Sequence, residues 1–416
     1  MPPSDGRHRF QRWIGPGKFP PTLRCMPPIA YLDHAASTPV RPEVREAMAP
    51  FAHDVFGNPS GIHSVARRAK TALEEAREQV AAGLGCDPGE VVFTGGGTEG
   101  DNLAVIGGAR RAARSGFGRR IVVSAVEHKA VSAAAEALGP EGFEVRVVRV
   151  GADGIVDLVD LERAIGPGTA LVSVMLVNNE VGTIQPLADV ADRVRSLAPR
   201  AVVHTDAVQG VPWLDVAAAV APADLVSVSA HKIGGPKGVG ALVVRDGVAL
   251  DPLLVGGGQE RGLRSGTVDV AGAVGLATAL TVTAERRAAD VVRVGRLRDR
   301  LADGLATVPG VVPNGDRSRV VAGNHHVRVT GVAAEDLLVA LDRDGVCAAA
   351  GSSCASGALE PSHVLAAMGL SRAEARESVR FSLGYASTDA DVDRALEVFP
   401  RVVARLRGVT EPAPVG

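Results

Sequence analysis

The stretch Ser227-Val-Ser-Ala-His-Lys-Ile-Gly-Gly-Pro-Lys-Gly238 decides the fold of this chain. The apolar run at residues 224–229 predicts a short buried strand, and His231 and Lys232 follow directly at its end. The Gly-Gly-Pro sequence after them predicts a turn before a second apolar run at residues 241–244. A lysine at a strand end among apolar and glycine residues is poorly solvated, which lowers its pKa and frees its amine as a nucleophile.

Three further apolar runs upstream also end in polar side chains. One ends at Asp206 and Gln209, one at Asn179 and Glu180, and one at His128. Proteins with α/β sheets build ligand sites at the carboxyl ends of their strands, so these groups are predicted to share one site with the lysine described above. A single lysine after a strand is more often a surface residue, but four converging strand ends favour the functional interpretation.

A strand at residues 90–94 runs directly into Gly95-Gly-Gly-Thr-Glu-Gly-Asp-Asn102, and a helix is predicted from Asn102 onward. A helix start presents unpaired N–H groups, and glycines let the backbone approach an anion closely. The junction therefore has the form of a phosphate site, to which Thr98 could donate its hydroxyl. It matches neither of the common glycine motifs for nucleotides, which disfavours nucleotide binding.

Seven candidate strands alternate with predicted helices, which is typical of an α/β fold with a mainly parallel sheet covered on both faces. The strands are expected at residues 91–93, 121–123, 145–150, 171–177, 201–204, 225–228 and 241–244. Helices are expected at residues 64–84, 102–113, 129–138, 158–165 and 187–197. A long helix over about 270–305 should lead into a smaller α+β unit with strands at 324–329 and 347–350 and helices at 334–342, 363–368, 373–378 and 390–406.

These elements predict a large domain at residues 43–288 and a small domain formed by residues 26–42 and 289–416. Residues 1–25 mix basic residues with prolines and lack the apolar core of a secretory signal, so a disordered N-terminal extension is expected.

The bulk properties exclude several classes of protein. The net charge of −2 and the 22% charged residues give no global field that would attract nucleic acid, and no apolar run approaches the length of a membrane helix. The four cysteines are scattered, without a CxxC pair, so a reducing cytoplasm is expected and a structural zinc site is not.

Nine short motifs occur in one order along the chain, and together they resemble the cysteine desulfurases of the NifS/IscS type, within the class V aminotransferases of fold type I. The resemblance runs from Tyr31 to about Gly408. The motifs are Tyr-Leu-Asp-His-Ala-Ala-Ser-Thr-Pro39, Gly-Asn-Pro-Ser60, Thr-Glu-Gly-Asp-Asn102, Glu-His-Lys-Ala-Val131, Asn-Asn-Glu-Val-Gly182, Ser-Ala-His-Lys232, Arg-Ser-Gly-Thr267, Gly-Ser-Ser-Cys-Ala-Ser356 and Arg-Phe-Ser-Leu-Gly384.

The resemblance implies a fold type I enzyme that depends on pyridoxal 5'-phosphate (PLP). Lys232 would hold the cofactor covalently at rest, and Asp206 would face its ring nitrogen and keep that nitrogen protonated. His128 would stack on the ring and shuttle protons, while Gln209 and Asn179 would donate hydrogen bonds to the ring oxygen.

The phosphate of PLP is assigned, by the same resemblance, to the glycine junction and to the end of the lysine-bearing strand. Its expected ligands are Gly97, Thr98, Ser229 and His231. The family more often has Ser or Ala among these glycines, so we expect a backbone contact to replace one side-chain contact here. Thr267 matches a residue that reaches the phosphate of the neighbouring subunit, which implies a homodimer with shared sites.

Two further residues complete the implied chemistry. Arg380 would bind the substrate α-carboxylate, which Asn179 would also contact. Cys354, in a loop of small residues, would attack the sulfur of L-cysteine, keep it as a persulfide and leave L-alanine. The sulfur would pass to an acceptor or scaffold protein for iron–sulfur cluster assembly or tRNA thiolation, where Cys354 could contact a nascent cluster. No resident metal, direct nucleic-acid partner or membrane contact is expected.

Two other kinds of function are compatible with the sequence. A selenocysteine lyase or another class V aminotransferase would share the fold and the cofactor, and an inactive PLP-bound scaffold subunit would share the partners. The presence of Cys354 and of the other expected catalytic residues favours the desulfurase.

Overall fold

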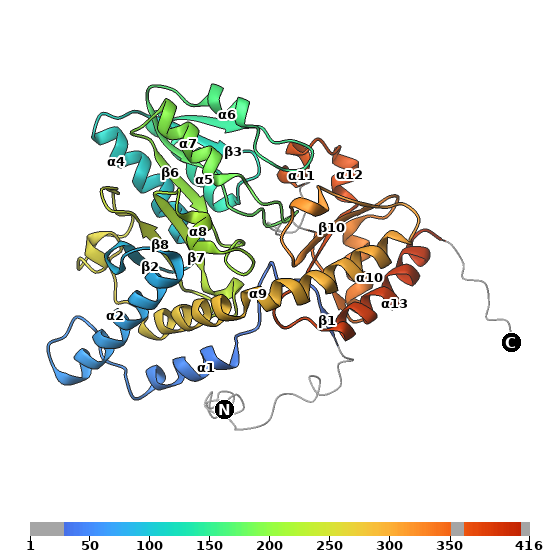
Figure 1. Ribbon diagram of the computed structural model, residues 1–416, viewed down its shortest axis with the longest axis horizontal. Coiled ribbons are helices and arrows are strands. Elements are labelled where there is room, and N and C mark those ends of the chain that lie inside the picture. Colours follow the sequence, from blue (N-terminus) through green and yellow to red (C-terminus); the bar gives the residue numbers. More distant parts are fainter. Residues whose placement is uncertain (1–28, 351–361, 409–416) are drawn as a thin grey trace, which may run out of the picture.

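The computed structural model describes residues 29–350 and 362–408 (Figure 1). The extension predicted at residues 1–25, Cys354 and the last residues of the chain lie outside this description. The larger part of the molecule is a seven-stranded sheet with helices on both faces, and a smaller part lies at the far end of the long helix α9 (Val270–Ala306).

The large sheet contains all seven strands that the sequence predicts, with ends shifted by a few residues. Strand β8 is antiparallel to both of its neighbours, and the remaining pairs are parallel. In spatial order the strands are β2 (Val91–Thr94), β8 (Gly240–Val244), β7 (Leu225–Ser229), β6 (Val202–Asp206), β5 (Thr169–Ser173), β3 (Arg120–Ser124) and β4 (Glu144–Val148).

Both faces of this sheet are buried, as the near-continuous apolar runs predict. Successive residues alternate between two cores: Val122 and Val172 belong to the core on one face, while Ile121 and Leu171 belong to the core on the other. The helices of this part are α1 (Pro42–Met48), α2 (Ser64–Leu84), α3 (Gly97–Asn102), α4 (Gly108–Arg114), α5 (Lys129–Glu136), α6 (Leu158–Ala164), α7 (Leu187–Leu197) and α8 (Val216–Val220).

The helix expected from Asn102 begins five residues earlier, at Gly97. Gly96 adopts a φ of 140°, a conformation that favours glycine, and so turns the chain directly into the helix. From α3 the helix continues through a wider π-helical turn, Leu103–Gly107, into α4. The consequence is that Gly97 and Thr98 themselves form the helix start.

Helix α9 connects two hydrophobic cores. Leu276 and Leu280 pack with the large sheet, whereas Leu297 and Leu301 pack in the smaller part. The smaller part contains a three-stranded sheet of β12 (Ser378–Ser382), β10 (Asn324–Val329) and β9 (Val311–Pro313), the pair β1 (Ala30–Tyr31) and β11 (Val346–Cys347), and helices α10 (Ala334–Arg343), α11 (His363–Ala367), α12 (Arg372–Arg376) and α13 (Asp389–Leu406).

The sequence interpretation was wrong at two places in the smaller part. The helix expected to end at Ser378 ends at Arg376, and Ser378 begins strand β12 because this run pairs antiparallel with β10 along its whole length. The strand expected at 347–350 is the short β11, after which Ala349 pairs with Arg380.

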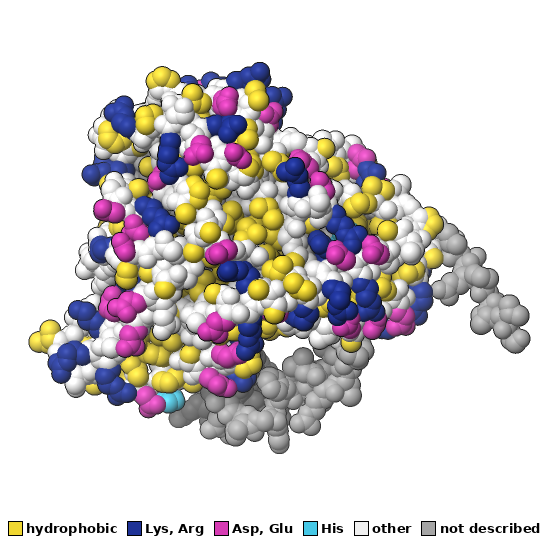
Figure 2. Space-filling model, in the orientation of Figure 1, with side chains coloured by type: hydrophobic (Ala, Val, Ile, Leu, Met, Phe, Trp, Pro, Cys, Tyr) yellow, Lys and Arg dark blue, Asp and Glu magenta, His cyan; other side chains and the backbone are white. Residues whose placement is uncertain are grey.

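The visible surface carries acidic and basic side chains interspersed with hydrophobic ones (Figure 2). None of the helices within the described ranges combines the length and the apolar character needed to cross a bilayer.

Candidate active site

A cavity of about 270 Å³ opens at the carboxyl ends of the parallel strands. Ten of the residues predicted for the site line it: Gly97, Thr98, His128, Asn179, Asp206, Gln209, Ser229, His231, Lys232 and Arg380. Thr267 is exposed and does not line this cavity, and Cys354 lies outside the described residues. Glu180 is buried and turned elsewhere, accepting a hydrogen bond from the Ser362 hydroxyl at 2.5 Å.

One end of the cavity brings a carboxylate and an imidazole together. Asp206 ends strand β6, is 5% exposed and accepts the N–H of Val208 at 2.9 Å. The Nδ1 atom of His128 accepts the N–H of Ala130 at 3.1 Å, which leaves the proton of the neutral ring on Nε2. Burial lowers the pKa of His128 and raises that of Asp206.

The start of helix α3 forms another part of the cavity wall, where backbone N–H groups lack helical acceptors. A Cβ atom at Gly97 would come within 2.9 Å of the Val208 side chain, so this close approach requires glycine. Ser229 and His231 line the same cavity from the end of strand β7. Burial lowers the pKa of His231 to about 4, so this ring is neutral and can donate one hydrogen bond.

Lys232 also lines this cavity. Its Nζ atom donates hydrogen bonds to the carbonyl oxygens of Ala35 at 2.6 Å and Ala36 at 2.8 Å. Burial, and then the positive charge of Arg380, lower the pKa of Lys232 to about 8. A substantial fraction of the amine is therefore unprotonated in mildly alkaline solution, as a nucleophile requires.

Arg380 reaches the cavity from strand β12 of the smaller part. Its guanidinium donates to the carbonyl oxygen of Asn179 and to the Asp33 carboxylate, each at 2.7 Å. The guanidinium is thus held in place while it lines the cavity. Sequence reasoning did not assign a role to Asp33 or to the carbonyls of Ala35 and Ala36, although it singled out the motif that contains them.

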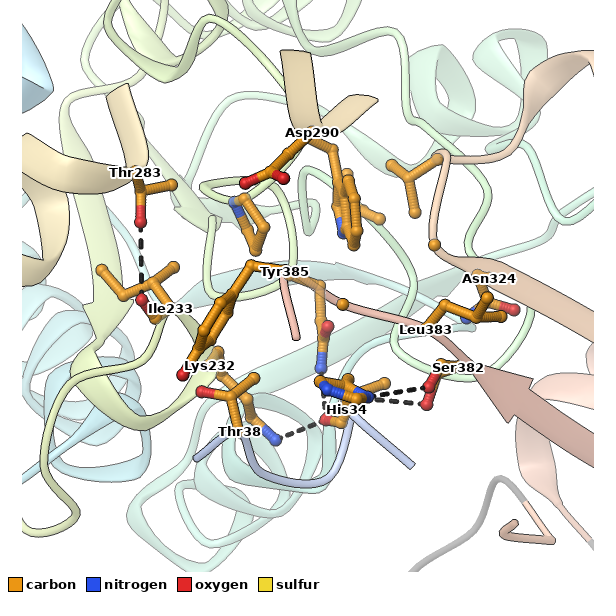
Figure 3. A pocket seen from close by; sticks show the side chains of 18 of the residues that line it. His34, Thr38, Lys232, Ile233, Thr283, Asp290, Asn324, Ser382, Leu383 and Tyr385 are labelled. Atoms are coloured by element: carbon orange, nitrogen blue, oxygen red, sulfur yellow. Dashed lines mark hydrogen bonds between the residues drawn. The ribbon is translucent and has the colours of Figure 1, made fainter. Parts of the chain in front are cut away.

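A second, smaller cavity of about 40 Å³ lies beside Lys232 (Figure 3). Lys232, Ala35 and Gln209 line both cavities, so they form the wall between them. The amide of Gln209 donates to the carbonyl of Ala35 at 2.8 Å, which is the same oxygen that Lys232 contacts.

Asp101 is the other site residue that sequence reasoning missed. It lies on helix α3, is 1% exposed and lines the cavity near Asp206. Its only signal in the sequence is its place in the motif Thr-Glu-Gly-Asp-Asn102, which was interpreted only as a phosphate site.

Two cysteines fall within the described residues, and neither lines the cavity. Cys86 follows the end of α2, and burial raises its pKa to about 11. Cys347 ends β11, and burial also raises its pKa. Raised pKa values disfavour the nucleophilic thiolate at both positions.

A mainly parallel seven-stranded sheet whose strand ends deliver a buried lysine, an aspartate and a glycine-bounded helix start defines the fold type I class of transferases. The chain belongs to the class-V aminotransferase family, whose model matches residues 30–395.

Three individual proteins show which members of the family this chain is similar to. An IscS-like cysteine desulfurase of Mycobacterium tuberculosis is 47% identical over 386 residues, which is 91% of this chain and 97% of that protein. A solved NifS-like protein superposes with a TM-score of 0.85 at 35% identity, covering 91% of this chain and all of the other. A solved SspA in complex with cysteine superposes with a TM-score of 0.75 at 35% identity, covering 85% of this chain and 98% of the other.

Proposed function

We propose that this protein is a PLP-dependent cysteine desulfurase, which converts L-cysteine into L-alanine and passes the sulfur to Cys354. The observation that carries the proposal is the convergence of Lys232, Asp206, His128 and Arg380 on one cavity. The similarity to named cysteine desulfurases over nine-tenths of the chain supports it.

The residues of the cavity fit PLP at each of its ends. The helix start at Gly97, with Thr98, Ser229 and His231, would hold the phosphate, and Asp206 would accept a hydrogen bond from the protonated ring nitrogen. His128 would stack on the ring, Gln209 and Asn179 would contact its oxygen, and Lys232 would hold it covalently. When bound, PLP supplies an electron sink for the carbon next to the substrate amino group.

The chain's own groups bind the substrate and move its protons. Arg380 binds the α-carboxylate through charge-assisted hydrogen bonds, with Asn179 beside it. Lys232 Nζ takes up and returns protons as a free amine, because its pKa is lowered to about 8. His128 presents Nε2–H to the same space and acts as a second proton donor.

The sulfur step is assigned to Cys354. Its thiolate attacks the substrate sulfur, an S–S bond forms and the substrate C–S bond breaks, with the electron pair remaining on the three-carbon fragment. That fragment takes up a proton and leaves as alanine, and the persulfide on Cys354 is passed to an acceptor or scaffold protein. Iron–sulfur assembly and tRNA thiolation in the cytoplasm are the proposed destinations.

The test is mass spectrometry of the protein after one turnover with L-cysteine in the absence of reductant. One extra sulfur is expected on the peptide that contains Cys354, and Cys354→Ser should bind PLP yet release almost no alanine. Alanine formation at the normal rate in Cys354→Ser would refute the sulfur step and favour another reaction of this family.

Cofactor attachment is tested separately. The purified protein should be yellow, and borohydride should remove the visible absorption while fixing the label on Lys232. Labelling at another lysine would contradict the assignment.

A homodimer is part of the proposal. Thr267 is exposed, and its loop is attached to the helix start of its own chain by the ion pair of Arg264 and Glu99 at 2.8 Å. We propose that this loop delivers Thr267 to the phosphate of the partner. Sedimentation should show a dimer at micromolar concentration, and a fully active monomer would overturn this assignment.

A further inference from the structure

The buried carboxyl group of Asp101 has no task in the function proposed above. It sits on helix α3, one turn after the helix start that faces the phosphate end of the cavity. Its exposure of 1% means that no bulk water solvates it, and its Oδ1 atom has no hydrogen-bond donor among the described residues. A buried carboxylate oxygen without a donor is costly, which favours the protonated form of this group.

Asp101 is close to a second buried carboxyl group, that of Asp206. One polar atom each of Asp101, His128 and Asp206 lie within 4.8 Å of one another. Two carboxylates this close in a buried site do not both ionise at neutral pH, because each negative charge disfavours the other. One of the two therefore carries a proton.

The hydrogen bonds around the two groups favour the charge on Asp206. Asp206 accepts the backbone N–H of Val208 at 2.9 Å, and such a bond stabilises the charged form. The imidazole nearest to Asp101 is His204, whose Nε2 atom lies 3.5 Å from Oδ1. His204 supplies no positive charge, because burial lowers its pKa to about 4 and its two nitrogens bond to the hydroxyls of Ser173 and Ser227.

We propose that Asp101 is a positioning residue that carries the shared proton, so that the one negative charge of the pair stays on Asp206, facing the cofactor. This inference rests on the proposed PLP site and deepens it. A neutral Asp101 lets Asp206 hold the protonated ring nitrogen as a single matched pair of charges.

Burial acts on both carboxyl groups in the same direction. Burial raises the pKa of Asp101, and a hydrogen bond from Ser227 opposes that shift only in part. Burial also raises the pKa of Asp206, and the hydrogen bond from the Val208 N–H opposes that shift. The ionisable groups that face the pair from the neighbouring elements are Glu127, His128, His204 and Lys232.

The first test uses infrared spectroscopy of the folded, cofactor-free protein at pH 6, where a protonated carboxyl group gives a carbonyl stretch distinct from that of a carboxylate. Asp101→Asn should remove one such band, and Asp206→Asn should retain it, because burial by itself raises the pKa of Asp101 to about 7. Glu127 contributes a band of its own, since burial raises its pKa to about 8, and Glu127→Gln identifies that band. Loss of the Asp101 band in Asp206→Asn, or its persistence in Asp101→Asn, would overturn the proposal.

The second test measures equilibrium binding of PLP to the cofactor-free protein. Asp101→Asn copies the shape of the neutral acid and should change the dissociation constant by no more than about threefold, within the spread of neutral substitutions. Asp206→Asn removes a charge-assisted bond and should weaken binding roughly tenfold to a hundredfold. Equal weakening in both variants would refute the assignment.

These readouts also separate the inference from the proposed function. A protein that binds PLP and shows the Asp101 band, but forms no alanine from cysteine, would refute the desulfurase alone. If Asp101→Asn does not fold, retention of the band in Asp206→Asn still supports the proposal, and its loss there still overturns it.

Discussion

The two sides of the cavity are built in different ways. The side proposed for the cofactor consists of side chains that follow neighbouring strands of one sheet, whereas the side proposed for the substrate joins Asp33 to Arg380, 347 positions apart in the sequence. Lys232 meets both sides, since it follows strand β7 and donates to the carbonyls of Ala35 and Ala36.

This difference has a physical consequence. On the cofactor side, the backbone ladder of a sheet buried on both faces fixes each side chain. The substrate side depends on hydrogen bonds between distant segments, such as the Ala35 N–H to the Ser382 hydroxyl at 2.9 Å and the Thr38 hydroxyl to the His231 carbonyl at 2.8 Å. We therefore expect substitutions on the cofactor side to abolish chemistry, and those on the substrate side to weaken binding.

The largest effect is expected from Lys232→Ala. Without the amine, steady-state formation of alanine should fall roughly 100-fold to 10,000-fold, the range of a lost acid–base group. Lys237→Ala is the matched control, because this lysine is exposed in the same turn and should leave the rate unchanged. Normal turnover in Lys232→Ala would break the distinction between the two sides.

Arg380→Gln should act mainly on binding. Charge-assisted hydrogen bonds contribute about 1.5–3 kcal/mol, so KM for cysteine should rise roughly tenfold to a hundredfold with a smaller change in kcat. Arg372→Gln, an exposed position on α12, serves as the control. A loss confined to kcat would instead show that Arg380 acts in the chemical step and not in substrate binding.

The pH dependence of cofactor uptake tests whether Arg380, on the substrate side, lowers the pKa of Lys232. Only the unprotonated amine of Lys232 reacts with the aldehyde of PLP, so the uptake rate of the cofactor-free protein should rise with pH and level off above about 8, where its pKa lies. Because the charge of Arg380 lowers that pKa, Arg380→Gln should move the midpoint to higher pH. Stopped-flow absorption between pH 6.5 and 9.5 measures both profiles, and an unchanged midpoint would contradict the coupling.

The smallest effects are expected from Cys86→Ser and Cys347→Ser. Neither thiol lines the cavity, so alanine formation should stay within about twofold of the wild-type rate, as for substitutions away from a site. An extra sulfur found on Cys347 after one turnover would instead assign the sulfur step to Cys347.

The elements that the sequence predicted are those governed by local pattern. Apolar runs bounded by glycine and proline specify the seven strands, and helix α2 has its predicted limits because His63 caps its start and Gly85, at a φ of 64°, ends it. Strand β12 was assigned in part to a helix because its five residues form a strand only by pairing with β10.

The sequence by itself determined the α/β class and the residues that leave the strand ends, including His128, Asp206 and Lys232, because strand direction and burial follow from patterns a few residues long. Only the tertiary structure decided that Asp33 pairs with Arg380, that the Ala35 and Ala36 carbonyls hold Lys232, and that Asp101 lies against Asp206. These contacts join segments far apart in the chain, and their energies depend on burial and on neighbouring charges, which no local pattern records.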